Sequence, residues 1–270
     1  MALHGFRPTE LVFIRLTLAG ITVGLVNTFQ RRKFAVFNLK ALTMGLFQFA
    51  GTYLLYTWSL KFLPSGVVGT LTLLSPVLTY FVASLAKVEK PSWPVGAAVL
   101  LSIFGASLCV PIKGQDFMII KEGAFGFLLI MLSNLSFAVG NVGVAKLSKS
   151  RENLESLTAG GLLWGALFCF VIYLVLPKTP FENLGHLNLW YLPLYLGVVA
   201  TGLGYMLWNQ GIVEISATLA SVVGNLKAPL SLFWGALLLS ESVSFQVTLG
   251  TVFIVAASGL LSFYKTRQPL

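Results

Sequence analysis

Residues 65–86 read SGVVGTLTLLSPVLTYFVASLA, a run of 22 residues that contains no charged side chain. As an α-helix that rises 1.5 Å per residue, this run is long enough to cross the ~30 Å hydrocarbon core of a bilayer. It is apolar all round, whereas a strand of a membrane barrel would alternate between apolar and polar residues. The run therefore predicts a membrane-spanning helix.

Eight other runs of the same kind are distributed along the chain. Together they give nine predicted transmembrane helices, at residues 9–29, 40–61, 65–86, 93–112, 123–146, 157–176, 189–211, 217–239 and 245–264. The connectors between them are short and rich in proline, glycine and charged residues, which leaves no room for a soluble domain. The predicted fold class is an all-α integral membrane protein.

The composition agrees with this fold class. Hydrophobic residues make up 56% of the chain and charged residues only 10%, whereas soluble domains carry about 25% charged residues. The net charge of +9 could suggest nucleic acid, but the basic residues lie in short gaps rather than on one face, so we expect no nucleic-acid partner. Cys109 and Cys169 lie inside apolar runs without metal-site or redox spacing and are predicted to be packing residues.

The basic residues are distributed unevenly between the two sides of the predicted bundle. One set of gaps holds eleven of them, namely Arg31, Arg32, Lys33, Lys40, Lys87, Lys90, Lys146, Lys149, Arg151, Lys265 and Arg267. The alternate gaps hold five, namely Arg7, Lys61, Lys113, Lys121 and Lys178. Because cytoplasmic loops are enriched in lysine and arginine, this bias predicts a cytoplasmic C-terminus and an outside N-terminus. A bacterial cytoplasmic (inner) membrane is the expected location.

The chain also repeats itself weakly. The stretch from Tyr53 to Pro76 matches the stretch from Tyr205 to Pro229 in character, and Gly96 and Gly105 recur as Gly250 and Gly259, at offsets of 152 to 154 residues. A repeat of this length predicts a transporter built from two halves, at residues 1–113 and 122–266. If the repeat unit has five helices, an odd number, the two halves are inverted relative to each other.

The two predicted halves differ in helix number, since the first contains four predicted helices and the second contains five. The helix without a counterpart is the first helix of the second half, at 123–146. We expect either that the protein lacks the corresponding helix or that its start codon lies upstream of Met1, and we favour the upstream start, because an unpaired half would leave a packing face open to lipid.

This pattern resembles the EamA-type transporters of the drug/metabolite transporter superfamily. The first half carries Pro8 and Arg15 at the opening of a helix, the stretch Tyr53–Leu63, and Leu74-Ser75-Pro76. The second half carries the matching elements Gly204–Asn209, Ala228-Pro229, and Leu239-Ser240-Glu241 followed by Gly250 and Gly259. The chain departs from the pattern at Lys87, which stands where the second half has Glu241. The resemblance implies two inverted five-helix repeats, a central cavity, and transport of small metabolites such as amino acids.

Lys227 is the main candidate for a substrate-binding residue. It lies about ten residues into the run 217–239, near the predicted membrane centre, where a charge costs roughly 2.5–3.5 kcal/mol. Pro229 and its counterpart Pro76 should break their helices and free the carbonyls of Asn225 and Thr72, since proline cannot accommodate the carbonyl four residues earlier. The functional interpretation is an anchor for a substrate carboxylate, and the alternatives are a structural lysine and a plain proline kink.

Other polar and aromatic residues within the runs complete the candidate site. The substrate-binding candidates besides Lys227 are Asn225, Asn134, Gln48, Tyr53 and Trp208. Asn141, Asn209 and Gln210 are polar residues of the same kind, for which hydrogen bonds between helices are the more common use. For Arg15 we favour a structural role, in which the side chain extends outward to the interface or pairs near Glu10.

The predicted function is secondary transport of a small organic metabolite, an amino acid or a carboxylate, by alternating access. No nucleotide-binding or hydrolase motif occurs, and all nine acidic residues lie at the ends of runs or in loops, so we expect neither an enzyme nor a cofactor. The expected partners are the substrate and membrane lipid, and a homodimer is left open. The alternative is a non-transporting membrane subunit or scaffold, such as a truncated paralogue.

Overall fold

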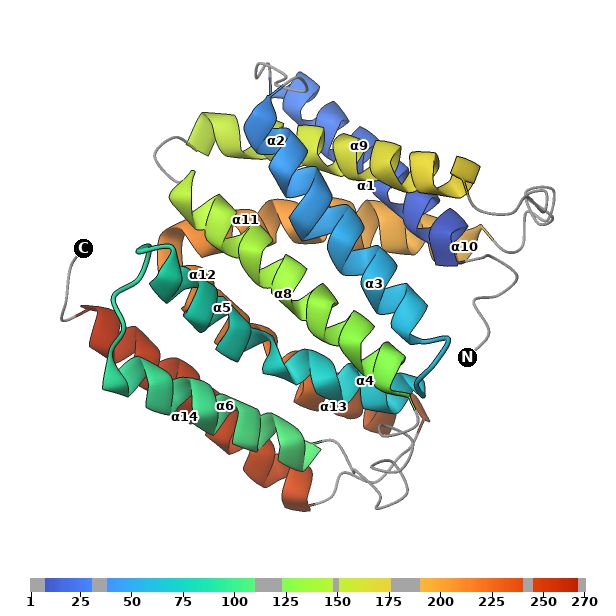
Figure 1. Cartoon of the computed structure of the whole chain (residues 1–270). Helices are drawn as coiled ribbons and strands as arrows, with labels where there is room; N and C mark the ends of the chain where they lie inside the picture. Colours follow the sequence, from blue (N-terminus) through green and yellow to red (C-terminus); the bar gives the residue numbers. More distant parts are fainter. Residues whose placement is uncertain are drawn as a thin grey trace.

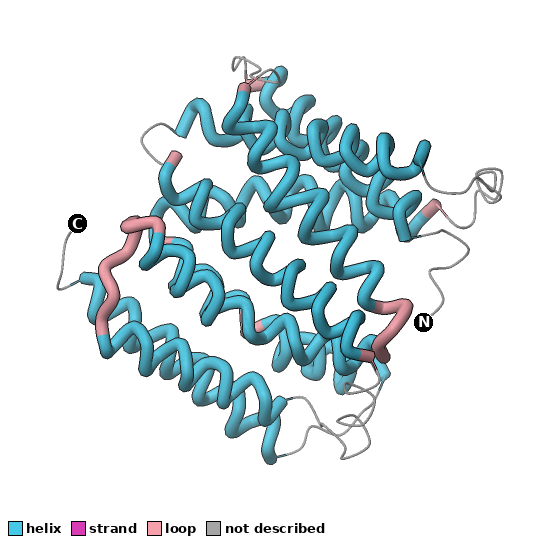
Figure 2. Tube along the Cα trace, in the orientation of Figure 1, coloured by secondary structure: helices cyan, strands magenta, loops and turns pink. Residues whose placement is uncertain are grey.

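The computed structural model describes residues 8–30, 38–109, 123–147, 151–175, 190–239 and 245–266. Within these ranges the chain is built from helices joined by short loops, and contains no strand (Figure 2). Five helical runs of the described residues are long and apolar enough to cross a membrane by themselves. The predicted all-α membrane fold is confirmed.

The described helices follow the order of the predicted runs. The N-terminal part comprises α1 (Pro8–Phe29), α2 (Leu39–Met44) continued by the π-helix η1 (Gly45–Gly51) and α3 (Thr52–Ser59), α4 (Ser65–Leu71) continued by the 3-10 turn η2 (Thr72–Leu74) and α5 (Ser75–Leu85), and α6 (Trp93–Cys109). The C-terminal part comprises α8 (Ala124–Lys146), α9 (Arg151–Val175), α10 (Tyr191–Leu194) continued by the π-helix η4 (Tyr195–Leu203) and α11 (Gly204–Ile215), α12 (Ala217–Gly224), α13 (Lys227–Leu239) and α14 (Phe245–Thr266).

Most helix ends lie close to the predicted boundaries, but two differ. The helix α9 begins at Arg151, six residues before the predicted start at 157, and α11 ends at Ile215, four residues after the predicted end at 211. Both extensions contain polar residues, and hydropathy locates the apolar part of a helix rather than its hydrogen-bonded ends. The predicted run 93–112 extends beyond α6 into residues outside the described ranges.

The helices form a layered bundle (Figure 1). At one end of the bundle α1 packs against α9, and at the other end α6 packs against α14. Between these pairs, α8 lies against both α3 and α5, while α1 also contacts η4. The N-terminal and C-terminal halves are therefore interleaved, so that most of the contacts at the centre join one half to the other.

The broken helices 65–85 and 217–239, which the sequence repeat predicts to be equivalent, touch each other. The Ser221 hydroxyl lies 3.0 Å from the Thr79 hydroxyl, and the side-chain nitrogen of Asn225 lies 3.3 Å from the carbonyl oxygen of Leu73. As the residue number rises along one helix it falls along the other, so the two helices run antiparallel. Antiparallel contact between equivalent helices is the arrangement that inverted repeats require.

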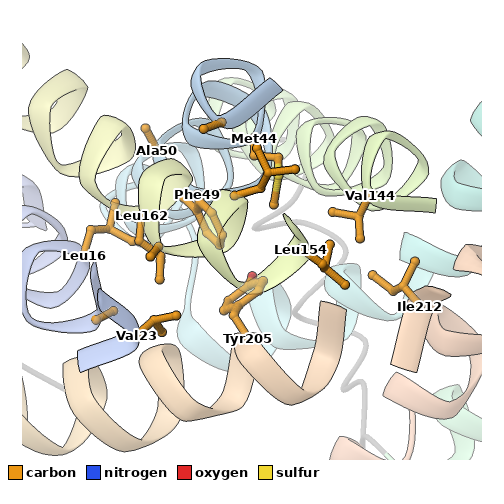
Figure 3. Packing of buried hydrophobic residues seen from close by; sticks show 14 of the residues in the cluster. Leu16, Val23, Met44, Phe49, Ala50, Val144, Leu154, Leu162, Tyr205 and Ile212 are labelled. Carbon is orange, nitrogen blue, oxygen red and sulfur yellow. The ribbon is translucent and has the colours of Figure 1, made fainter. Parts of the chain in front are cut away.

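The largest apolar core lies where α1, η1, α9 and α11 meet (Figure 3). Leu16 from α1, Phe49 from η1 and Leu162 from α9 are completely buried, and Tyr205 from α11 packs edge-on against the Phe49 ring. Large apolar side chains also cover the outside, among them Phe81, Phe104, Leu132, Val171 and Phe233. An apolar exterior of this kind is suited to lipid rather than water.

Glycines allow the backbones of α9 and η1 to approach closely. A Cβ atom added at Gly45 would lie 2.7 Å from the Trp164 Cβ and 2.8 Å from the Gly161 carbonyl oxygen. One added at Gly165 would lie 3.0 Å from the Phe49 Cβ. The Gly161–Gly165 spacing therefore serves close helix packing, as it commonly does in membrane helices.

Candidate functional site

A network of buried amide side chains crosses the contact between the two halves. The Gln48 side-chain nitrogen donates hydrogen bonds to the amide oxygens of Asn141, at 3.0 Å, and Asn209, at 2.8 Å. The Asn209 nitrogen donates in turn to the Thr158 hydroxyl at 3.0 Å. Gln48, Asn141, Asn209 and Thr158 are all completely buried. Two helices of the C-terminal half, α8 and α11, thus bind Gln48 of the N-terminal half, and α9 holds Asn209 through Thr158.

Asn141 is the member of this network with unused hydrogen-bonding capacity. Its amide oxygen accepts from Gln48 and also from the indole nitrogen of Trp208, at 3.3 Å. Its buried amide nitrogen has no hydrogen-bond partner within the described part of the chain. A buried donor without a partner costs about 1–3 kcal/mol, so this nitrogen is available to a polar group that enters the site.

The local backbone explains how Gln48 reaches this network. Gln48 lies in the π-helix η1, and π-helical turns widen a helix and often occur at functional sites. The equivalent helix of the C-terminal half contains the second π-helix, η4, which starts 150 residues after η1. Two segments 150 residues apart in the chain therefore depart from α-helical geometry in the same way.

A second polar cluster surrounds Arg15. From α1, the Arg15 side chain extends into the bundle, where its Nε donates to the Thr201 hydroxyl and its Nη2 donates to the Tyr53 hydroxyl at 3.0 Å. The guanidinium carbon lies 4.1 Å from the centre of the Tyr53 ring, in cation–π geometry. The predicted orientation of Arg15, outward or toward Glu10, is wrong, because the side chain turns inward to α3 and η4.

The two proline positions show broken helices. In the helix 65–85 the break is the turn η2, and Pro76 lies in the first turn of α5, where its missing N–H is not needed. In the helix 217–239 the break falls at Asn225 and Leu226, between α12 and α13, and Pro229 again lies in the first turn that follows.

The prediction that the prolines free two backbone carbonyls is wrong. The Thr72 carbonyl accepts a hydrogen bond from the Ser75 N–H, and the Asn225 carbonyl accepts one from the Ala228 N–H at 3.1 Å. Each carbonyl accepts its hydrogen bond from the N–H three residues later instead of four, as in a 3-10 turn. The break costs few backbone hydrogen bonds and leaves neither oxygen open to a substrate.

Asn134 and Asn225 are engaged at the first of these breaks. The Asn134 side-chain nitrogen donates to the Leu71 carbonyl at 2.8 Å, and that of Asn225 donates to the Leu73 carbonyl at 3.3 Å and the Ser102 hydroxyl at 3.1 Å. Side chains commonly satisfy carbonyls at a broken membrane helix. In the described structure both amide nitrogens therefore stabilise the turn η2, while the buried oxygen of Asn225 has no hydrogen-bond partner among the described residues.

Lys227 is placed differently from the other candidates. It is the first residue of α13, directly after the break, and its side chain is exposed. No hydrogen bond or ion pair joins its ammonium group to another residue of the described segments. A cation at this position, about halfway along the helix 217–239, carries an uncompensated charge at membrane depth.

A buried carboxylate lies near the amide network, on the first turns of α9. The Gln210 side-chain nitrogen donates to Oε1 of Glu155 at 2.7 Å, and Glu155 is buried. Among the described residues no group of three histidine, cysteine, aspartate or glutamate side chains could hold a metal ion. Among the described residues, the polar interior is composed of amides, hydroxyls and a few charged side chains.

The structure distributes the six predicted binding residues over several places. Gln48 and Trp208 meet at Asn141, Tyr53 lies with Arg15, Asn134 and Asn225 hold the break near Leu71 and Leu73, and Lys227 stands apart. Thr158, Thr201 and Tyr205 were not among the predicted site residues. Threonine and tyrosine within an apolar run give no signal that separates a site from ordinary packing.

Comparison with known proteins assigns this bundle to a family. The family model of the EamA-like transporter family matches residues 1–110 and 124–263. The chain belongs to the EamA-like transporter family. It is therefore a membrane transporter protein by family, which agrees with the resemblance found in its sequence.

Individual EamA-like relatives are distant in sequence. An uncharacterized transporter of Bacillus subtilis, YoaV, is 24% identical over 99% of this chain and 91% of its own length. A probable biotin transporter of Pseudomonas aeruginosa is 29% identical over 91% of this chain and 85% of its own length. The biotin transporter of Salmonella typhimurium is 26% identical over 72% of this chain, and the match spans about two thirds, 65%, of that protein.

A solved structure supports the same fold. The crystal structure of one protein, 17% identical in sequence, superposes with a TM-score of 0.79 over 97% of this chain and 90% of its own chain. At this identity the likeness concerns the fold alone.

Proposed function

We propose that this EamA-like protein is a secondary transporter of a small organic carboxylate, such as an amino acid or a biotin-like acid, and that it works by alternating access. The observation that carries the proposal is the polar contact between its halves. Gln48 binds Asn141 and Asn209, Thr79 binds Ser221, and Asn225 binds Ser102, each bond joining one half to the other.

A polar contact of this kind suits a moving interface. Hydrogen bonds between side chains can be exchanged for bonds to water or substrate when the halves separate, whereas a purely apolar contact would expose its whole surface. Alternating access requires such a separation, first on one side of the membrane and then on the other. We propose that the two halves, 1–113 and 122–266, rock about this contact.

The charges of the interior favour an anionic substrate. Lys227 and Arg15 are cations at membrane depth, and neither has a carboxylate partner among the described residues. Charged residues inside a membrane bundle commonly mark substrate pathways. Of the relatives compared above, one is named a biotin transporter and one a probable biotin transporter, whereas the name of YoaV gives no substrate. Biotin carries a carboxylate, as amino acids do.

In this proposal the six predicted residues line the substrate path. Lys227 attracts the carboxylate, while Gln48, Tyr53 and Trp208 contact the rest of the molecule. Asn134 and Asn225 stabilise the turn η2 in the broken helix 65–85. The excess of basic residues on one side supports a cytoplasmic C-terminus and an inner-membrane location.

The proposal is tested by transport into proteoliposomes. Purified protein reconstituted in liposomes should exchange external radiolabelled biotin or an amino acid of a defined panel for internal unlabelled compound. Empty liposomes provide the background. If no compound of the panel is exchanged by protein that remains folded, the non-transporting subunit becomes the better description.

Lys227→Leu is expected to lower this exchange about tenfold, the effect of losing roughly 1.4 kcal/mol of attraction. The matched control is Lys61→Leu, which removes an exposed lysine after α3 and should leave the exchange unchanged. Both variants are compared at equal amounts of folded, reconstituted protein. Equal exchange by Lys227→Leu and the wild type would remove Lys227 from the substrate path.

A further inference from the structure

Arg15 is the cation of the interior whose geometry is best defined. Its side chain starts from α1 and reaches η4 at Thr201 and α3 at Tyr53, so three helices meet at one guanidinium. The helices that contain Tyr53 and Thr201 are equivalent members of the two halves. Arg15 therefore lies at the contact along which the halves must move.

The partners of Arg15 hold it but do not neutralise it. All its described contacts are with neutral groups, namely two hydroxyls and the face of an aromatic ring. Taking a charge out of water costs several kcal/mol unless an opposite charge offsets the loss. These contacts hold the Arg15 side chain in position. They leave its positive charge available to an anionic group.

The hydrogen-bonding capacity of Arg15 is only partly used. A guanidinium carries five N–H donors, one on Nε and two on each terminal nitrogen. One donor of Nε and one of Nη2 are engaged, which leaves three, two on Nη1 and one on Nη2. No described residue accepts a hydrogen bond from these three. Two adjacent donors of this kind match the two oxygens of a carboxylate.

The aromatic residues below Arg15 fix the plane of the guanidinium. Tyr53 stacks beneath it and also packs edge-on against Tyr205, with ring centres 6.2 Å apart. Tyr205 is itself held edge-on against the completely buried Phe49, at 4.9 Å. An arginine held in one plane loses less conformational entropy when it binds a planar anion.

The structure assigns the direct contact with a substrate carboxylate to Arg15, held by Tyr53 and Thr201. This assignment rests on the proposed transport of a small carboxylate and names the group that recognises its charged end. Lys227, which is exposed and lacks a described partner, contributes attraction rather than a defined geometry. Arg15 itself is half-buried, so a ligand can reach its free edge.

The assignment is tested by thermal unfolding of the detergent-purified protein with matched pairs of compounds. The pairs are biotin and biotinamide, L-leucine and L-leucinamide, and phenylacetate and phenylacetamide, which differ within each pair at the carboxylate. A ligand that binds only the folded state raises the melting temperature. We expect at least one acid to raise it and its amide to have little effect.

Arg15→Gln is expected to weaken binding of that acid about 100-fold, because a bidentate contact with a charged partner is lost. Arg15→Lys keeps the charge but not the planar pair of donors, and should weaken binding less than Arg15→Gln. Tyr53→Phe removes the hydroxyl that positions Nη2 and should show an intermediate loss. The control Lys61→Gln removes an exposed charge just after α3, the helix that contains Tyr53. This variant should bind the acid as tightly as the wild type does.

Several outcomes would overturn the assignment. The acid could bind Arg15→Gln as tightly as the wild type, the amides could bind as well as the acids, or Lys227→Gln could abolish binding while Arg15→Gln retains it. If neutral or amine compounds alone are bound and transported, transport itself holds, but the proposed carboxylate substrate class and the Arg15 assignment both fail. If exchange in liposomes also fails for all compounds, both fail. Unfolding without ligand shows whether each variant is folded.

Discussion

Gly140→Ala is expected to destabilise the protein by about 3 kcal/mol, toward the upper part of the range for overpacked cores. A Cβ atom at this position would lie 2.5 Å from the Gln48 Cβ, 2.6 Å from its Cα and 2.8 Å from its backbone nitrogen. Two of these three atoms belong to the backbone of η1, so no side-chain rotation can relieve the overlap. The helix α8 would have to move away from η1.

The chain offers a close control for this substitution. Gly143 lies one turn further along α8, and a Cβ atom there meets nothing within 4 Å. Gly143→Ala should therefore leave stability unchanged or raise it by up to about 1 kcal/mol, because alanine is the better helix former. Thermal and denaturant unfolding in detergent distinguish the two variants. Equal stability of both would show that α8 and η1 do not approach as closely as described.

The class and the order of the described helices followed from the sequence because lipid imposes a simple requirement. A helix that crosses the bilayer needs about 20 apolar residues, whatever it packs against. The breaks at Pro76 and Pro229 were also predictable, since the covalent ring of proline excludes regular helix at a fixed place. The hydrogen-bond partners of the Thr72 and Asn225 carbonyls were not predictable. Whether each carbonyl bonds to the N–H three residues later depends on the residues that follow.

The two π-helices were not predicted, because no pattern in residues 45–51 or 195–203 separates a π-helical turn from an α-helical one. Their positions depend on packing. In η1, Gly45 lies against Gly161 and Gly51 lies against Ser136, whose hydroxyl would overlap an added Cβ atom. Contacts between residues so far apart in the chain become visible only once the helices are assembled.

The candidate site was predicted residue by residue but not as an arrangement. A polar residue deep in an apolar run indicates a constraint, and Gln48, Asn134 and Asn225 are indeed fully or nearly fully buried. Arg15 shows the limit of this reasoning. A helix that is apolar all round has no periodic signal to mark its inward face. The depth of Arg15 in the predicted helix therefore could not show whether its side chain is directed toward lipid or toward Tyr53.

Gln48→Leu is expected to cost about 2–3 kcal/mol, because it removes the donor shared by two buried amides. Among the described residues, the Asn209 amide oxygen would lose its one donor, and the Asn141 oxygen would keep only the Trp208 donor, at 3.3 Å. If the network acts as a unit, Asn209→Leu should lower the stability less when it is made in the Gln48→Leu variant than when it is made in the wild type. The double variant removes groups that would otherwise be buried without partners, and the coupling energy should exceed about 1 kcal/mol.

The size of this coupling separates a network from an ordinary contact between helices. Hydrogen bonds between membrane helices contribute about 0.6 kcal/mol on average, and the pair Thr79 and Ser221, joined by one hydroxyl bond of 3.0 Å, provides that reference within the same protein. A cycle of Thr79→Val and Ser221→Ala should give a value close to it. A Gln48–Asn209 coupling no larger than this reference would mean that the amides bind pairwise. A larger coupling would identify a cooperative polar core, which must be broken as a whole for the halves to separate.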